Sequence, residues 1–401
     1  MRNNKKNILM LGLIDARKND ASKIHFFELA KSFLAESNSV TLIIPHNSVE
    51  PELIEGMSVI KIPMNYNENF IRIFILSIFQ FAYYIFLSSN SYDFVYIRWR
   101  LLPCFLFKIV NILRNNKTRI ITEHNGWIKL EAQIQHSNKI YSLVGYLLQI
   151  LDAFFADKVI AVTQGIKDKI IQAKIDGSKI EVIGNGTNIN HFYPMKNRNE
   201  LKSKFLNLKD ELVLGFIGNI SKWQGLDSLV NIFENLSKSH QKLILLIIGS
   251  GLYLEELKVK VENISTKNKI IFKENIPYRE MNLWMNIIDI AFAPKSYLLN
   301  EIGYSPLKIR DYAAAGKPVI STNVNGIKEL VKFGWLKTYK NEAECENIIG
   351  NLISNPDKLK EMSFKARKYA VENFNWNIIA NKIVRISEDN INNINNKQLT
   401  K

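Results

Sequence analysis

Short apolar runs alternate with amphipathic segments along most of the chain, and polar loops separate them. The first unit has an apolar run at 7–13, a polar loop at 15–22, an amphipathic segment at 23–36 and a second run at 40–44. Apolar residues every three or four positions predict a helix, and a short unbroken run predicts a buried strand. A strand, a helix and a strand in this order form a βαβ unit, so the pattern predicts an α/β fold with a parallel sheet.

The alternation continues to a last amphipathic segment at 376–386. Further strands are predicted at 57–62, 92–97, 120–122, 158–162, 180–183, 212–218, 243–248, 270–272, 290–293 and 319–322. Further helices are predicted at 70–87, 101–113, 141–156, 226–236, 305–316 and 356–374. At 401 residues the chain is long enough for two domains, each with its own core.

The predicted helix at 70–87 is apolar around most of its circumference, and Arg72 is its only charged residue. Its length is that of a transmembrane helix. However, the next strand of the same sheet is predicted at 92–97, and a membrane crossing would separate the strands of one domain. Two interpretations stay open: a buried crossover helix, or a helix whose outer face dips into the bilayer interface. A second apolar and basic helix at 101–113 favours a membrane-proximal acceptor.

The net charge of +15 widens the range of partners to consider. Such a charge suits anionic substrates, nucleic acid or an anionic membrane surface, or it reflects a lysine-rich surface. No nucleic acid is expected as a partner, because the chain has no RNP, helix-turn-helix or zinc-finger pattern. Cys104 and Cys345 stand alone, which argues against a disulfide framework and fits a reducing compartment. The N-terminal apolar run is too short for a secretory signal, so the expected location is cytoplasmic, with peripheral contact to the inner face of the cell membrane.

Candidate chemistry concentrates at 289–329, which is predicted to form a strand, a loop, a helix and another strand. Ser305 is a good N-cap and Pro306 suits a first helical position, so the pair predicts a helix start. Such a start offers free backbone N–H groups and the positive end of the helix dipole. The segment is therefore a candidate anion site.

Lys308 and Asp311 fall on the first turns of this predicted helix. A cation beside a phosphate and a carboxylate beside sugar hydroxyls would together hold a nucleotide. The segment SPLKIRDYAAAGKPVIST resembles the donor-binding segment of the retaining glycosyltransferase family 4, in the subgroup that carries an SPLK-x-x-E-Y helix. The resemblance extends over nearly the whole chain.

This resemblance implies the GT-B fold, in which two Rossmann-like α/β domains face a cleft. It implies an acceptor-side domain at 1–195, a nucleotide-sugar domain at 196–374 and a helix at 375–390 that crosses back to the first domain. The Asn- and Lys-rich residues 391–401 are expected to be disordered. A nucleotide-diphosphate sugar would be the co-substrate, with no other cofactor. No metal is expected, because the chain lacks an Asp-x-Asp motif.

The loop at 218–225 is the second candidate element of the donor site. Gly218 follows a predicted strand, and a glycine there lets the backbone approach a ligand. Many family members carry Arg and Lys at the positions of Asn219 and Gln224, so this chain resembles a W-Q-G variant in which amides replace the cations. Lys222 either restores one positive charge or is a solvated surface lysine, and Lys308 has the same surface alternative.

The family signature has two Glu with seven residues between them. Asp311 occupies the second Glu position by this resemblance, and Gly303 occupies the first. The expected donor-binding residues are Gly218, Asn219, Lys222, Gln224, Tyr304, Ser305, Pro306, Leu307, Lys308 and Asp311.

In the first domain, a polar cluster begins with Glu123 and His124 after the predicted strand at 120–122. Open α/β sheets bind ligands after the carboxyl ends of their strands. The cluster resembles an E-x-N-G or E-x-H-G element of the family, which makes His124, Glu123 and Lys308 the catalytic candidates. The alternative is a capping cluster that satisfies loop backbone groups. His25 stands at a family His position, but Asp20-Ala21 replace the Gly-Gly pair before it.

The sequence therefore predicts a retaining glycosyltransferase that moves a hexose from a nucleotide-diphosphate sugar to a glycan or lipid-linked acceptor in cell-surface polysaccharide synthesis. One alternative is a non-catalytic relative that binds a nucleotide sugar or a partner, as the atypical residues Asn219, Gln224 and Gly303 suggest. A Rossmann oxidoreductase would require G-x-G-x-x-G after the first strand, and the residues from Gly12 onward do not match it.

Overall fold

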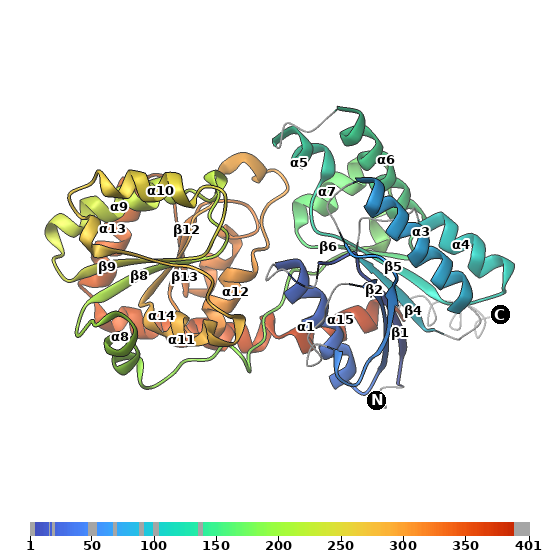
Figure 1. The fold of residues 1–401 in the computed structure, drawn as a ribbon, viewed down its shortest axis with the longest axis horizontal. Helices are drawn as coiled ribbons and strands as arrows, with labels where there is room; N and C mark the ends of the chain where they lie inside the picture. The colour runs from blue at the N-terminus through green and yellow to red at the C-terminus, as the bar shows by residue number, and fades with distance from the viewer. Residues whose placement is uncertain are drawn as a thin grey trace. The chain divides into compact units, whose positions relative to one another are not determined.

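The computed structural model describes residues 5–15, 17, 21–46, 54–66, 70–87, 92–98, 104–134 and 139–388. The chain divides into two compact units (Figure 1). Unit 1 contains residues 1–185 and 376–401, and unit 2 contains residues 186–375. The division falls before the expected boundary at 195. Asp20 and the expected disordered tail at 391–401 lie outside the described residues.

Within the described residues, unit 1 has a seven-stranded sheet with the order β3-β2-β1-β4-β5-β6-β7, and every neighbouring pair is parallel. The strands are β1 Asn7–Leu11, β2 Ser39–Pro45, β3 Ser58–Ile62, β4 Phe94–Arg98, β5 Arg119–His124, β6 Lys158–Ala161 and β7 Ile180–Val182. The helices are α1 Ala21–Ala35, α3 Phe70–Leu87, α4 Cys104–Leu113, α5 Ile128–Ile134, α6 Lys139–Phe155, α7 Gln164–Gln172 and α15 Trp376–Ile386. The last helix, α15, packs against α1 of the same unit.

Unit 2 has a six-stranded parallel sheet in its described part, with the order β10-β9-β8-β11-β12-β13. The strands are β8 Leu212–Ile217, β9 Leu243–Ile248, β10 Ile270–Lys273, β11 Ile290–Ala293, β12 Val319–Thr322 and β13 Leu336–Tyr339. The helices are α8 Arg198–Leu206, α9 Leu226–Ser239, α10 Leu254–Glu262, α11 Met281–Ile287, α12 Leu307–Ala314, α13 Glu342–Ile353 and α14 Pro356–Tyr369. The two sheets confirm the prediction of two Rossmann-like units.

Two apolar layers cover the two faces of the sheet in unit 2. One layer contains side chains of α8, α11 and α12, such as Leu201, Trp284 and Ile309. The other contains side chains of α9, α10 and α13, such as Phe233 and Leu257. Strands buried on both faces are near-continuous apolar runs, which explains why a segment such as LILLII in β9 was readable as a strand.

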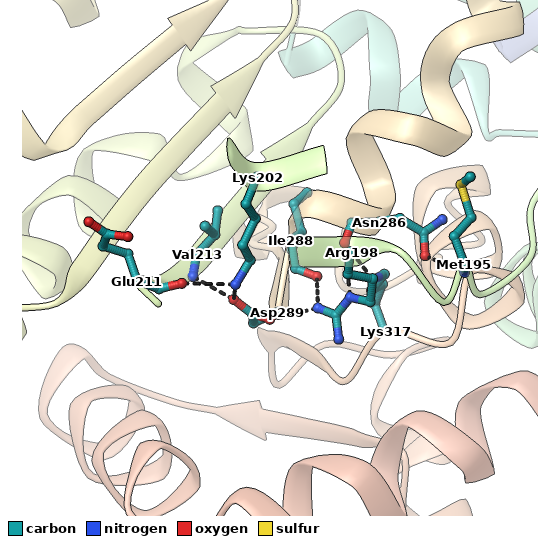
Figure 2. A network of polar contacts seen from close by, with 9 residues as sticks. All are labelled: Met195, Arg198, Lys202, Glu211, Val213, Asn286, Ile288, Asp289 and Lys317. Atoms are coloured by element: carbon teal, nitrogen blue, oxygen red, sulfur yellow. Dashed lines mark hydrogen bonds and ion pairs between the residues drawn. The ribbon is translucent and has the colours of Figure 1, made fainter. Parts of the chain in front are cut away.

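A partly buried ionic network anchors the amino edge of this sheet (Figure 2). Asp289, directly before β11, accepts hydrogen bonds from Arg198 Nη2 at 2.6 Å and Lys202 Nζ at 2.6 Å, both on α8. The backbone N–H of Val213, in β8, donates to the same carboxylate at 2.8 Å. One carboxylate thus connects a helix to the starts of two strands, far from the carboxyl edge where α/β sheets bind ligands.

Helix α3 has the predicted bounds but is neither fully buried nor fully exposed. Gln80 is buried and donates to the carbonyl oxygens of Gly12 at 3.1 Å and Ile43 at 3.0 Å, which connects the helix to the ends of β1 and β2. On the other side Phe74 and Phe86 are exposed. Among the helices of the described residues, none is both long and apolar enough to span a bilayer.

Candidate active site

The carboxyl edge of the sheet in unit 2 is lined by glycine backbone. Gly218 follows β8 with φ 148°, and Gly249 follows β9 with φ 151°. A Cβ at Gly249 would lie 1.9 Å from Gly218 O, so the two loops pass in backbone contact. A Cβ at Gly218 would lie 2.6 Å from Lys308 Nζ. Glycine at 218 is therefore what allows the Lys308 ammonium to lie over the end of β8.

Two lysines from different elements converge on Gln224 at this edge. Lys308 Nζ donates to Gln224 Oε1 at 3.3 Å, and Lys295 Nζ donates to the same oxygen at 3.0 Å. Gln224 and Lys295 are buried, whereas Lys308 is partly exposed. Lys308 Nζ also lies 3.9 Å from the Phe216 ring centroid, and Lys295 Nζ lies 5.6 Å from that of Tyr304. We call Gln224, Lys295 and Lys308 the lysine cluster.

Burial and mutual repulsion control the charges of the lysine cluster. Burial lowers the pKa of Lys295 to about 8. Burial also lowers the pKa of Lys308 well below its ordinary value, and the nearby charge of Lys295 lowers it further. The protonated lysines are therefore held in a place where positive charge is unfavourable, and an anion placed there would stabilise them.

The elements that carry the two lysines are held tightly to the sheet. Lys295 N–H donates to Thr322 Oγ1 at 2.6 Å, and this hydroxyl donates to Lys295 O at 2.8 Å. On α12, Tyr312 OH accepts the backbone N–H of Ile217 at 2.6 Å. These bonds connect β11, β12, β8 and α12 at one edge, so both lysines come from positions set by backbone contacts.

The start of α12 differs from the prediction. Pro306, with φ −74° and ψ 132°, is the residue at the cap, and Leu307 is the first helical residue. The Ser305 hydroxyl accepts a hydrogen bond from Arg310 Nη2 at 2.9 Å. Pro306 was expected at the first helical position, but its backbone is extended, so the helix begins one residue later. Pro306 provides no side-chain cap, and the start of a helix carries backbone N–H groups that suit an anion.

The other expected donor residues have different surroundings. Asp311 Oδ1 accepts from Thr187 Oγ1 at 2.6 Å, so one carboxylate oxygen is already bonded. Tyr304 OH donates to Ser296 O at 2.7 Å, which supports the loop that carries Lys295. Lys222 lies apart from the lysine cluster: it is exposed, and its Nζ forms an ion pair with Glu256 at 2.9 Å. Asn219 is exposed.

In unit 1, Glu123 lies inside β5 rather than in a loop, and it is buried in a polar network. The Tyr96 hydroxyl donates to Glu123 Oε2, and Asn125 Nδ2 donates to Oε1 at 2.6 Å. His25 Nε2 lies 3.1 Å from Glu123 Oε2, and Arg98 Nε lies 3.8 Å from Oε1. Burial raises the pKa of Glu123, but His25, Arg98 and Tyr96 outweigh it and hold the pKa at about 2.

His124 is the last residue of β5 and is fully buried. Its Nδ1 accepts from Gln149 Nε2 at 3.2 Å, and Gln149 also donates to Gly126 O at 2.8 Å. Burial lowers the pKa of His124 to about 4, so it is neutral at pH 7. Consecutive strand residues point to opposite faces, and Glu123 faces α1 while His124 faces α6. The expectation that both residues lie in a loop is wrong, because pairing with β4 and β6 extends β5 through them.

The sequence analysis missed the roles of Lys295 and His25 in these clusters. Lys295 is a lysine in an irregular loop, and no spacing rule links it to Gln224. His25 was noticed by its position in the family pattern, but only the fold places it against Glu123. Among the described residues, no group of three or more His, Cys, Asp or Glu could hold a metal ion.

Comparisons with known proteins match both units. Residues 23–191 match the family described as Glycosyltransferase Family 4, and residues 197–369 match Glycosyl transferases group 1. An uncharacterized glycosyltransferase of Methanocaldococcus jannaschii is 26% identical over 286 residues, which are 70% of each chain. The capsular polysaccharide biosynthesis glycosyltransferase CapM of Staphylococcus aureus is 25% identical over 256 residues, 58% of this chain and 62% of CapM. Anabaena HepE, crystallised with UDP-glucose, shares the fold with a TM-score of 0.72 and 18% identity over 95% of this chain and 98% of HepE.

Proposed function

We propose that this chain, which belongs to the glycosyltransferases of family 4, transfers a hexose from a nucleotide-diphosphate sugar to a glycan or lipid-linked acceptor, with retention of anomeric configuration. The reaction would serve cell-surface polysaccharide synthesis, as the name of the relative CapM suggests. The observation that carries the donor part is the lysine cluster at the carboxyl edge of unit 2, where Lys308 lies in the first turn of α12.

The chemical task is to stabilise the diphosphate that leaves while the sugar gains oxocarbenium character. Fixed positive charge and helix N–H groups placed at the leaving oxygens lower the barrier without reorganising during the reaction. Lys308 is partly exposed and immobilised by Gln224 and Phe216, so it is the first candidate for this charge. Asp311 would contact the ribose, and Thr187 Oγ1 holds its carboxylate in place through a hydrogen bond of 2.6 Å.

The polar residues of unit 1 do not suit a proton-transfer role at pH 7. A general base works best when its pKa lies near the operating pH. Glu123 has a pKa of about 2 and His124 of about 4, so both are poor bases. We assign them to holding the reacting sugar or its loop in place, and the leaving phosphate takes the acceptor proton.

A thermal-shift screen tests the donor assignment. UDP-, GDP-, ADP- and dTDP-sugars are added to the protein, and a sugar donor that binds the folded state raises the melting temperature. We expect one base to give the largest shift and Lys308→Ala to reduce it. If no nucleotide sugar shifts the melting temperature, the proposed function is wrong. Release of nucleoside diphosphate with an added lipid or glycan acceptor then tests transfer itself.

A nucleotide-sugar-binding protein without turnover is the second candidate. Gly303, at the position of the first family Glu, has φ 72°, and a Cβ there would lie 3.0 Å from Asn325 O. A glutamate therefore does not fit this turn without strain, and its contact with the donor must be absent or supplied otherwise. Donor binding without release of nucleoside diphosphate would favour this candidate.

We also propose that unit 1 contacts an anionic membrane. Helix α4 packs against α3 and α6 (Figure 1). The three helices expose a set of large apolar side chains, which we call the apolar face: Ile71, Phe74, Ile78, Phe86, Ile109, Ile112, Leu113, Ile140, Leu143, Val144, Leu147, Leu151 and Phe154. An exposed apolar surface of this extent marks an interaction site. Helix α6, which was predicted only as apolar, contributes nearly half of it.

Liposome sedimentation tests the apolar face. Replacing Ile112 and Leu113 by Glu should reduce binding to phosphatidylglycerol vesicles, because both side chains are more than 75% exposed. Leu252→Glu is the matched control, since Leu252 is a fully exposed leucine of unit 2. Equal sedimentation of all variants would exclude the apolar face as the membrane contact.

A further inference from the structure

The family pattern leaves the donor diphosphate of this chain short of positive charge, because Asn219 and Gln224 occupy the two usual cation positions. The structure places another charge at the second of them. Lys295 Nζ lies 3.0 Å from Gln224 Oε1, on a loop after β11 rather than on the loop after β8. We propose that Lys295 supplies the cation missing at 224, so that Lys295 and Lys308 form a two-lysine seat for the donor diphosphate. This inference rests on the proposed function.

The two lysines of the cluster repel each other, and the charge of Lys295 lowers the pKa of Lys308. Both ammonium groups bond to one oxygen atom, so they lie within roughly 6 Å of each other, where like charges repel appreciably even at moderate dielectric. The oxygen they share belongs to a neutral amide, which supplies a dipole but no negative charge. A diphosphate carries negative charge on two adjacent phosphates, and it can accept from both ammonium groups at once.

The seat is built before any ligand arrives. The main chain of Lys295 is held by Thr322 through both its N–H and its carbonyl oxygen. The side chain of Lys308 lies against the Phe216 ring and against Gly218. A side chain at position 218 would displace the Lys308 ammonium group. Gln224 is buried and follows Ser221, whose carbonyl oxygen accepts the Gln224 N–H at 2.9 Å. A phosphate group would thus meet fixed donors and lose little entropy in ordering them.

Gln224 and Lys295 depend on each other in this arrangement. A lysine at 224 would put a third ammonium group against Lys295 and Lys308 in a buried place. An amide at 224 without Lys295 would leave Lys308 as the only cation of the cluster. The positive charge therefore comes from the loop after β11 instead of the loop after β8, but it lies at the same place on the carboxyl edge. Exchanging the residues at 224 and 295 should return the charge to the loop after β8.

Nucleotide affinities measured by calorimetry test the seat. The probes are UDP with UMP, GDP with GMP, ADP with AMP, and dTDP with dTMP. In the unaltered protein we expect the best diphosphate to bind more tightly than its monophosphate. Lys295→Gln should weaken binding of that diphosphate by about tenfold or more and change binding of the monophosphate by less than about twofold, because the lost charge faces the second phosphate. Lys295→Arg should retain most of the diphosphate affinity.

Two further variants separate this role from a structural one. Lys317→Gln removes another buried lysine of unit 2, at the amino edge, and should leave the diphosphate-to-monophosphate affinity ratio unchanged. The double variant Gln224→Lys with Lys295→Gln should recover diphosphate affinity relative to Lys295→Gln alone. Circular dichroism of each variant confirms that it is folded before affinities are compared.

The outcomes distinguish this inference from the proposed function. If the unaltered protein binds none of the eight nucleotides, the donor assignment itself is wrong. If it binds diphosphates and Lys295→Gln keeps the full preference over monophosphates, only the two-lysine seat is wrong. An equal loss of both affinities in a folded Lys295→Gln protein would also overturn the seat, since it would indicate a general effect on the loop.

Discussion

Basic side chains that are buried or partly buried gather at both edges of the sheet in unit 2, but the two edges balance the charge differently. At the amino edge, Arg198 and Lys202 each bond to the Asp289 carboxylate at 2.6 Å (Figure 2). At the carboxyl edge, Lys295 and Lys308 share the neutral oxygen of Gln224. The first arrangement is an ion-pair network that holds elements together. The second keeps positive charge concentrated where a substrate can use it.

This difference shows how buried lysines with structural and functional roles can be distinguished. A carboxylate between cations cancels their repulsion, and removing it leaves uncompensated buried charge. An amide between cations carries no negative charge, so it does not cancel their repulsion. Neutralising a residue should therefore have opposite effects on stability at the two edges.

The largest effect is expected for Asp289→Asn. The change leaves Arg198 and Lys202 without their carboxylate, and we expect the free energy of unfolding to fall by about 3 kcal/mol. Urea denaturation measures this, with Asp210→Asn as the control, because the exposed pair of Asp210 and Lys242 should contribute less than about 1 kcal/mol. A fall no larger than that of the control would mean that the network does not hold the amino edge.

The next largest effect is expected for Lys308→Met, which should increase the stability of the protein and weaken donor binding. Removing a cation that burial and Lys295 both disfavour should raise the free energy of unfolding by about 1 kcal/mol. Donor binding should weaken by about tenfold or more, because a charge-assisted bond to phosphate is lost. Melting temperatures with and without nucleoside diphosphate report both. If Lys308→Met were less stable than the unaltered protein without ligand, Lys308 would have a structural role instead.

A pH profile sharpens the comparison further. Lys295 has a pKa of about 8 in the folded state, below its ordinary value of 10.5. Between about pH 8 and pH 10.5 the unfolded chain therefore keeps the Lys295 proton that the folded protein has lost. Its contribution to stability should therefore rise as pH increases from about 8 to 10.5, whereas diphosphate affinity should fall over the same range as the charge is lost. Lys295→Arg, which stays charged, should flatten both changes. If the diphosphate affinity of Lys295→Arg depended on pH as strongly as that of the unaltered protein, Lys295 would not be the source of the pH dependence.

The smallest effect on nucleotide binding is expected for Asp152→Asn in unit 1, where a buried carboxyl lies between α6 and α4. Asp152 Oδ1 accepts the backbone N–H of Cys104 at 2.8 Å, and burial raises the pKa of Asp152 to about 8. Because only the unfolded chain releases the Asp152 proton between about pH 4 and pH 8, the protein loses stability as the pH rises through this range. We expect Asn to stabilise the protein more at pH 8 than at pH 5 and to remove this slope, with nucleotide binding unchanged. Denaturation curves at pH 5 and pH 8 would show it.

Much of the fold could be predicted, because buried parallel strands are continuous apolar runs. The segments at 243–248, 290–293 and 319–322 have the predicted bounds, as does α3. The error at Ser305 is local and one residue long: Pro306 has an extended backbone and occupies the cap position, so the helix starts at Leu307. The error at Glu123 and His124 has a distant cause, because strand pairing with β4 and β6 overrides their polar character.

Part of the candidate site could also be predicted from local sequence patterns. Gly218, Gln224 and Lys308 lie in motifs with fixed spacing, so sequence alone pointed to them. Lys222 carries the same charge as Lys295 and lies nearer in sequence to Gln224, yet its Nζ pairs with Glu256 on α10. Choosing between these two lysines requires knowing which loops meet at the sheet edge.

By itself, the sequence determined the α/β class, the two sheets, the family and the motifs at the ends of β8 and at α12, since these depend on local periodicity and spacing. Only the tertiary structure decided which charges share a neighbour: Lys295 with Lys308, Arg198 with Asp289, and His25 with Glu123. The physical reason is that electrostatic interactions depend on distance and burial in space. Residues that are 71 or 91 positions apart acquire such contacts only when the sheet brings their loops and helices together.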